Sequence, residues 1–121
     1  ILIPASGETQ IDIATASCVL QDNIALSGDL NIFRTKENGI FLSYLIRSKL
    51  KMQIAQLAQG NSVVHLYASQ LKGVSFSLPC LEEQTKIANF LSAIDQKIEV
   101  VAQQIEQAKQ WKKGLLQQMF V

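Results

Sequence analysis

The stretch that decides the fold of this chain is its C-terminal run, SLPCLEEQTKIANFLSAIDQKIEVVAQQIEQAKQWKKGLLQQMFV (77–121). After Pro79 it contains no further proline and one glycine, Gly114. Its apolar residues recur at alternating steps of four and three: Ile87, Leu91, Ile94, Ile98, Val101, Ile105 and Ala108. This heptad spacing, which Leu115 continues, predicts a helix that pairs with a second helix along one seam. At 1.5 Å per residue the helix would be about 57 Å long.

The residues before this helix carry strand signals first and a helical period later. Short apolar runs bounded by turn residues predict strands at 1–3, 11–13, 17–20, 24–26 and 30–33. Apolar residues then recur every three or four positions, which predicts an amphipathic helix over 39–58. Asn38 is the expected N-cap, and Gly60 is the expected C′ residue. Further strands are predicted at 63–66 and 74–78, with a single helical turn at 70–72 capped by Ser69.

This order of elements predicts an α+β fold. Residues 1–79 would form a mixed β region with one inserted helix, and residues 80–121 would form a long coiled-coil helix. With 121 residues and 48% apolar content, the chain is long enough for one ordinary domain. The chain begins at Ile1, inside a strand-like run and without a methionine, so we expect a fragment of a longer gene product.

Composition narrows the function classes. A net charge of +1 excludes a strongly basic tail but neither nucleic-acid nor protein partners. Cys18 and Cys80 lie far apart and only one histidine is present, so a zinc site is not expected. We expect both cysteines to be free thiols in a cytoplasmic protein. No apolar run reaches the roughly 18 residues of a membrane span, and no signal peptide is visible.

No arrangement of residues in the sequence predicts catalysis. His65 lies between apolar residues of a predicted strand, and no pattern joins it to Ser62 or Ser69 as a triad. Glu82 and Glu83 begin the long helix, where the helix dipole explains them. Basic residues could contact phosphates or could line solvated helix faces, and composition favours the second interpretation. They fall in three groups: Arg34 and Lys36; Arg47, Lys49 and Lys51; Lys109, Lys112 and Lys113.

The helical stretch resembles the conserved helical region of Type I restriction–modification specificity (S) subunits. In that region a strand leads into Leu-Pro, a Glu-Gln pair begins the helix, and Ile-Ala-x-x-Leu-x-x-Ile-Asp follows. The matching residues here are Leu78, Pro79, Glu83, Gln84, Ile87, Ala88, Leu91, Ile94 and Asp95, and then Lys112, Lys113, Gly114, Leu115, Leu116 and Phe120. Upstream, GDLNIFR (28–34), FLSYLIRS (41–48), GNSVVHL (60–66) and ASQLKGVSFSLP (68–79) are similar to the target recognition domain of the same family.

The chain differs from the family in length. Family recognition domains usually carry more sequence before the Gly-Asp strand, and complete subunits usually have two recognition domains and two spacer helices. By this comparison, residues 1–79 correspond to the C-terminal part of one target recognition domain. Residues 80–121 correspond to one conserved spacer helix.

The resemblance implies a non-catalytic specificity subunit, or half of one, that reads one half of a split target in double-stranded DNA. Paired antiparallel spacer helices would fix the distance between the two halves. A methyltransferase (modification) subunit would methylate adenine with S-adenosylmethionine, and a restriction subunit would cut DNA with ATP and Mg. The chain itself would hold no cofactor, and no membrane is implied.

Residue type and position then suggest which side chains contact DNA. Polar side chains can donate to and accept from base edges, and lysines can contact phosphates. The candidates for base contact are Gln59, Gly60, Asn61, Ser62 and His65, followed by Thr9 and Gln10. The candidates for phosphate contact are Lys36, Lys49 and Lys51.

One heptad seam needs a second one, so we expect a homodimer through the C-terminal helix. Its contacts would be Ile87, Leu91, Ile94, Ile98, Val101, Ile105 and Leu115. An alternative of another class is a coiled-coil interaction module, or a silent recombination cassette, without DNA-binding activity. The salt dependence of any DNA binding separates these alternatives, because phosphate contacts release counterions. A stand-alone enzyme has the least support.

Overall fold

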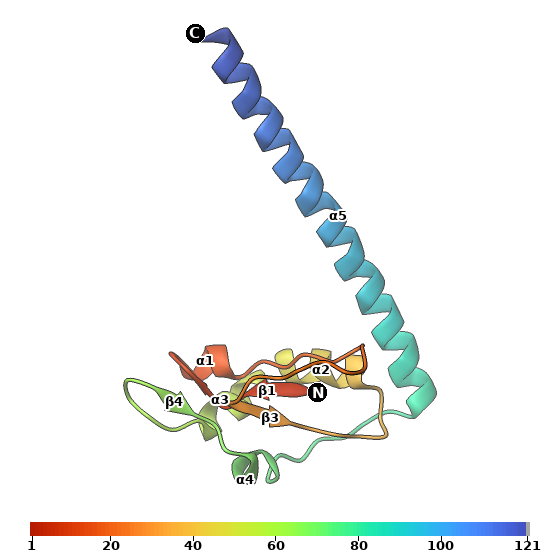
Figure 1. Ribbon diagram of the computed structural model, residues 1–121. Coiled ribbons are helices and arrows are strands. Elements are labelled where there is room, and N and C mark those ends of the chain that lie inside the picture. Colours follow the sequence, from red (N-terminus) through yellow and green to blue (C-terminus); the bar gives the residue numbers. More distant parts are fainter. Residues whose placement is uncertain (121) are drawn as a thin grey trace. The chain divides into compact units, whose positions relative to one another are not determined.

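The computed structural model describes residues 1–120 and confirms the α+β class (Figure 1). The elements, in chain order, are β1 (Leu2–Pro4), β2 (Ser6–Gly7), α1 (Gln10–Ile13), β3 (Leu30–Ile32), α2 (Gly39–Arg47), α3 (Lys51–Leu57), β4 (Val64–His65), α4 (Ala68–Leu71) and α5 (Leu81–Met119). The chain divides into two compact units, Ile1–Ala88 and a second that begins at Asn89. The first two turns of α5 therefore belong to the first unit.

Two small antiparallel sheets organise the first unit. β1 pairs with β3, with Leu2 opposite Ile32, and β2 pairs with β4, with Ser6 opposite His65. Ala5 joins the sheets, because its amide donates to the Asp29 carbonyl (3.0 Å) and its carbonyl accepts from the Leu66 amide (2.9 Å). The Asn31 side chain adds a bond of 2.9 Å to the Leu66 carbonyl. Strands far apart in the sequence are thus held as one platform.

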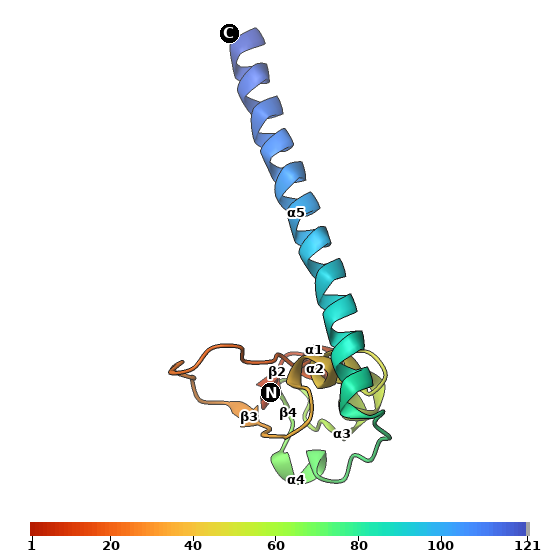
Figure 2. The ribbon, with the colours of Figure 1, turned by 90° about the vertical axis from the view of Figure 1, so that its right-hand side faces the viewer.

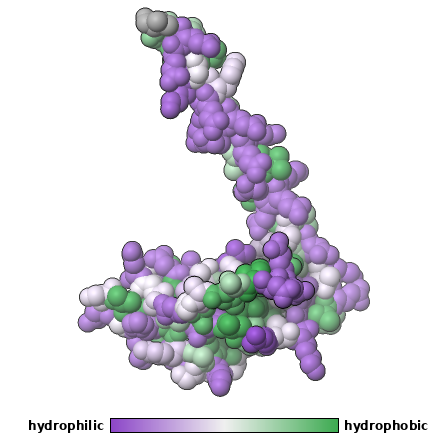
Figure 3. Space-filling model, in the orientation of Figure 1, coloured by the Kyte–Doolittle hydropathy of each residue, from purple (hydrophilic) through white to green (hydrophobic). Residues whose placement is uncertain are grey.

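The core of the first unit forms where α1, α2 and α3 cover this platform. Its buried residues include Ile3, Ile13, Ile46, Ile54 and Leu66. The predicted stripe of Leu42, Ile46, Leu50 and Ile54 is buried as expected. A second, smaller cluster joins Phe41 and Leu42 of α2 to Ala88 of α5. Figure 3 shows an apolar patch on the face of this unit that carries β1 and β3.

The predicted helix over 39–58 is interrupted, and this part of the prediction is wrong. Asn38 is the N-cap as expected, since its Oδ1 accepts from the Phe41 amide at 2.9 Å. At Ser48, however, the backbone leaves the helical range (φ −110°, ψ −87°), and the hydroxyl donates to the Tyr44 carbonyl at 2.7 Å. This local bonding competes with helix continuation. α3 then begins at Lys51 and ends at Leu57, so Gly60 is not its C′ residue.

The prediction of strands at 11–13, 17–20 and 24–26 is also wrong. Residues 10–13 form one helical turn, because Thr9 caps it by accepting from the Asp12 amide at 3.1 Å. A strand would place Ile11 and Ile13 on one face, whereas Ile11 is 41% exposed and Ile13 only 1%. Between α1 and β3, Ser17 forms a bridge with Leu2. Figure 2 shows the rest as a long loop extending from the domain, in which Leu20 and Ile24 are exposed.

Residues 74–78 do not form the predicted strand. Val74 packs against the main core and Leu78 against the smaller cluster, so the alternating pattern marks packing on the core rather than pairing with a strand. The predicted turn at 70–72 is shifted. α4 begins at Ala68 with Tyr67 as its N-cap, and Ser69 lies inside it. The Gln70 side chain explains the shift, since it accepts from the Tyr67 amide (2.8 Å) and donates to the Leu57 carbonyl (2.7 Å).

Gln84 joins the start of α5 to the start of α2. Its side chain is fully buried, at 0% exposure. Its Oε1 accepts from the Asn38 amide at 3.1 Å, and its Nε2 donates to the Glu37 carboxylate (2.7 Å) and the Pro79 carbonyl (2.9 Å). The amide therefore satisfies groups on both sides of the junction, and no apolar side chain of that size could replace it.

Replacing Gln84 with Ala should lower the free energy of unfolding by about 1–3 kcal/mol, because the partners of its amide lose their bonds in a partly buried place. Urea denaturation followed by circular dichroism measures this. Gln103→Ala is the matched control, since Gln103 lies on the same helix, is exposed, and its side chain bonds to Glu99. It should change stability by less than about 0.5 kcal/mol. Equal effects of the two substitutions would contradict the role of Gln84.

Candidate nucleic-acid interface

The segment Gln59–His65, here called the hairpin loop, is a closed and fixed structure. The Gln59 amide donates to the His65 carbonyl at 2.9 Å, and the His65 amide donates to the Gln59 carbonyl at 2.7 Å. Gly60 has a φ of +133°, and a Cβ there would lie 2.0 Å from the Val63 carbonyl oxygen. Only glycine fits this turn. Figure 1 shows the loop projecting from one end of the first unit, between α3 and β4.

The hairpin loop presents side chains to solvent. Asn61 and Ser62 are exposed, and within residues 1–120 neither side chain has a hydrogen-bond partner. Val63 is 52% exposed, whereas Val64 is buried. The His65 ring stacks on Tyr67 with ring centroids 6.2 Å apart and planes 17° apart. The polar side chains have no internal partners and lie next to an exposed aromatic pair. The loop could therefore bind a molecule that offers both hydrogen-bonding groups and an aromatic or apolar surface.

The structure brings Thr9 and Gln10 to the base of the hairpin loop. β2 pairs with β4, and α1 follows β2 directly and contacts β4. The Gln10 Nε2 donates to the Ala58 carbonyl at 3.1 Å, so this amide supports the loop from inside the protein. The Thr9 hydroxyl caps α1 and also donates to the Asp12 carboxylate. Both side chains thus have internal partners.

The three lysines proposed for phosphate contact lie elsewhere. Lys36 is exposed and precedes α2, whose N-terminus is bonded to Gln84. Lys49 and Lys51 lie at the break between α2 and α3, at the opposite end of α3 from the hairpin loop. The nearby Arg47 guanidinium lies 4.9 Å from the centre of the Tyr44 ring. The structure therefore separates the predicted base-contact and phosphate-contact groups.

The second unit consists of α5 from Asn89 onward, and its heptad seam is exposed. Ile94, Ile98, Val101 and Ile105 are between 41% and 60% exposed. Leu91 and Leu115 are half-buried. Ile87, in the first unit, packs against the cluster of Phe41, Leu42 and Ala88. A seam of this kind is the arrangement that pairs by inserting side chains between those of a second helix.

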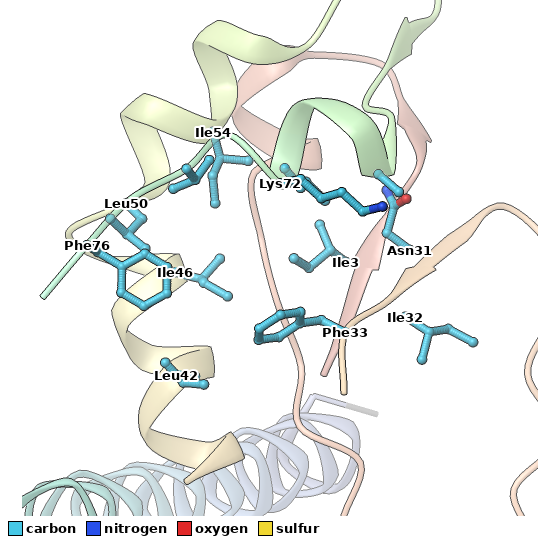
Figure 4. A pocket seen from close by; sticks show the side chains of 13 residues that line it. Ile3, Asn31, Ile32, Phe33, Leu42, Ile46, Leu50, Ile54, Lys72 and Phe76 are labelled. Atoms are coloured by element: carbon cyan, nitrogen blue, oxygen red, sulfur yellow. The ribbon is translucent and has the colours of Figure 1, made fainter. Parts of the chain in front are cut away.

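A pocket of about 180 Å³ lies between β3, α2, α3 and the segment around Phe76 (Figure 4). Ile46 and Leu50 line one side of it, and Phe33 and Ile3 line another. Lys72 and Asn31 bring its polar groups, and the Asn31 amide already donates to the Leu66 carbonyl. The lining therefore lacks the converging polar groups of a catalytic site.

In residues 1–120, no group of three or more His, Cys, Asp or Glu side chains is arranged to hold a metal ion. Within the same residues, no helix has both the length and the apolar character that crossing a membrane requires.

Comparison with known proteins identifies the family. The family model described as "Type I restriction modification DNA specificity domain" matches residues 6–110. The chain belongs to this family. The match includes the hairpin loop and most of α5, so the specificity-domain resemblance in the sequence is confirmed.

Two relatives from Methanocaldococcus jannaschii agree with this assignment. The type I restriction enzyme MjaX specificity subunit is 34% identical over 99 residues, which are 76% of this chain and 23% of the relative. The MjaVIII specificity subunit is 31% identical over 81 residues, 67% of this chain and 19% of the relative. The chain thus spans less than a quarter of the length of these relatives. No solved structure matches the chain.

Three residues of this specificity domain gain importance only from the structure. Val63 and Tyr67 are exposed beside the polar residues of the hairpin loop, although their type suggested core positions. Gln84 is buried, although glutamine is usually exposed. The one signal in the sequence was the Glu-Gln pair at the start of the helix, which the family resemblance contained. Its physical reason is visible only in the bonds of Gln84 to α2.

Replacing Gly60 with Ala should open the hairpin loop, because alanine at this φ is strained and its methyl group meets the Val63 carbonyl. The strain alone should cost about 1–3 kcal/mol of the free energy of unfolding. Amide exchange at Gln59 and His65 should become faster. Gly28→Ala is the control, since no heavy atom lies within 4 Å of a Cβ there. An unchanged exchange rate in the Gly60 variant would show that the loop does not depend on this turn.

Proposed function

We propose that the chain reads DNA sequence for a Type I restriction–modification enzyme and carries no catalytic activity of its own. The observation that carries this proposal is the family match over residues 6–110, which includes both the hairpin loop and the seam-bearing helix. A coiled-coil module without a DNA role is less favoured, because such a module does not require the first unit to match a DNA specificity domain.

The chemistry of the hairpin loop supports base reading. Asn61 and Ser62 are exposed, polar and without internal partners, so no existing bond must break before they contact DNA. Amide and hydroxyl groups recognise base edges in the major groove. A loop fixed by Gly60 and by the two backbone bonds between Gln59 and His65 loses little conformational entropy on binding. Gly60 and His65 would therefore act mainly by positioning Asn61 and Ser62.

The basic residues away from the loop would contact phosphates. Lys36, Lys49 and Lys51 would neutralise backbone charges and set orientation without reading sequence. Thr9 and Gln10 would support the loop and stand near its contacts. This division gives the two groups of side chains different experimental signatures.

The second unit would pair the chain with a second copy of itself. Four branched apolar residues in a row on one face of a helix lose contact with water when the same face of another helix covers them. A second copy offers an identical seam, and pairing of identical faces gives a closed two-fold dimer. Two copies would then present two hairpin loops to one DNA duplex.

Methylation and cleavage would belong to partner subunits. A methyltransferase subunit would carry the S-adenosylmethionine, and a restriction subunit would use ATP and Mg. The chain would locate these subunits on double-stranded DNA in the cytoplasm. Its own residues would bind no cofactor.

DNA-binding variants test the proposal. For the complex of the chain with the methyltransferase subunit of the same system, the double variant Asn61→Ala and Ser62→Ala should lose preference for the selected site and keep its salt dependence. The double variant Lys49→Gln and Lys51→Gln should weaken binding to all duplexes and lower the slope of log affinity against log salt by about 2. Fluorescence anisotropy at several salt concentrations measures both.

Two other results would count against this proposal. A chain that forms a clean dimer but neither associates with the methyltransferase subunit nor binds DNA would support the coiled-coil module instead. Unchanged site preference in the Asn61 and Ser62 variant would remove the hairpin loop from the interface.

Replacing Ile98 with Asp should convert the dimer to a monomer, because pairing would bury an unpaired carboxylate in the seam. Light scattering at several protein concentrations gives the mass. Val100→Asp is the matched control, since Val100 is exposed to a similar degree (53% against 60% for Ile98) but lies off the seam. The control should stay dimeric. A dimer in the Ile98 variant would show that the seam is not the interface.

A further inference from the structure

Val63 is an apolar side chain that the hairpin loop holds in water. It is 52% exposed, although its neighbour Val64 is 4% exposed and belongs to the core. The exposure does not come from an open segment, because Gln59 and His65 close the loop with two backbone bonds and Gly60 fixes its turn. The backbone of the loop therefore holds Val63 outside the core.

The neighbours of Val63 indicate what it contacts. Asn61, Ser62 and Val63 are consecutive, and all three are exposed. In the major groove, asparagine pairs with the adenine edge, serine pairs with several edges, and apolar side chains contact the C5-methyl group of thymine. Thymine is the base that presents a methyl group there. Two hydrogen-bonding residues followed by an apolar one would suit a contiguous set of base contacts.

We infer that Val63 is a specificity-determining residue that contacts a thymine methyl group beside the base pairs contacted by Asn61 and Ser62. This inference rests on the DNA-reading role proposed above. Two other exposed apolar loop residues fit such a role less well. Leu20 and Ile24 lie in the long segment between α1 and β3, with the carboxylate of Asp22 between them, which would repel DNA phosphates.

Thymine-to-uracil replacement tests the contact, because deoxyuridine lacks only the methyl group. The complex of the chain with the methyltransferase subunit first selects duplexes from a random library, and each thymine of the selected site is then replaced singly. At one thymine per half-site, the replacement should weaken binding about fourfold, the effect of one methyl-sized apolar group. Val63→Ala should bind the thymine duplex more weakly and show no further loss on the uracil duplex. Leu20→Ala should keep the full thymine preference.

Three results would overturn the inference while leaving DNA reading intact. They are a selected site without thymine, binding insensitive to every replacement, and a Val63→Ala variant that keeps the fourfold thymine preference. The absence of any sequence-selective binding would instead remove the proposed function and this inference with it.

Discussion

The fold depends on a buried amide at the point where the long helix begins. The Gln84 side chain accepts from the Asn38 amide and donates to Glu37 and to the Pro79 carbonyl, so the start of α2 and the start of α5 share one set of hydrogen bonds. Ala88, one turn later, packs on Phe41 and Leu42. A polar bond network and an apolar contact therefore hold the same two turns of α5 to the domain. Losing either would weaken the packing of these two turns on α2 within the first unit.

The hairpin loop differs from this junction, because most of its side chains lie outside the core. Its backbone is fixed from within by Gly60, by the bonds of Gln59 to His65 and by the support of Gln10 on Ala58. Its side chains at Asn61, Ser62 and Val63 face solvent. A rigid backbone that carries exposed side chains is well suited to recognition. Contacts made on binding need not offset the entropy cost of ordering the loop.

Four features could be predicted from the sequence, because they follow from apolar spacing and capping chemistry. They are the long helix, the strand at 30–33, the Asn38 cap and the stripe from Leu42 to Ile54. The errors share a cause. At 39–58, and at Ile13, Val74 and Leu78, the apolar pattern correctly marked side chains that pack on the core, whereas Ile11 is 41% exposed. Side-chain bonds of Thr9, Ser48 and Gln70, or the lack of a neighbouring strand, then decided the backbone conformation. The polar loop at 59–65 was located from residue type, but the exposure of Val63 and Tyr67 could not be predicted, because valine and tyrosine are residue types that a local pattern assigns to the core.

In the proposed function, two identical copies of this chain would direct methylation to one DNA sequence. The most direct test is to map methylated adenines in the genome of cells that express the chain with the methyltransferase subunit of the same system. Two-fold pairing predicts methylation at a single motif, an inverted repeat of one short half-site separated by a spacer of fixed length. Methylation without a shared motif, or a motif with two unrelated half-sites, would contradict the account.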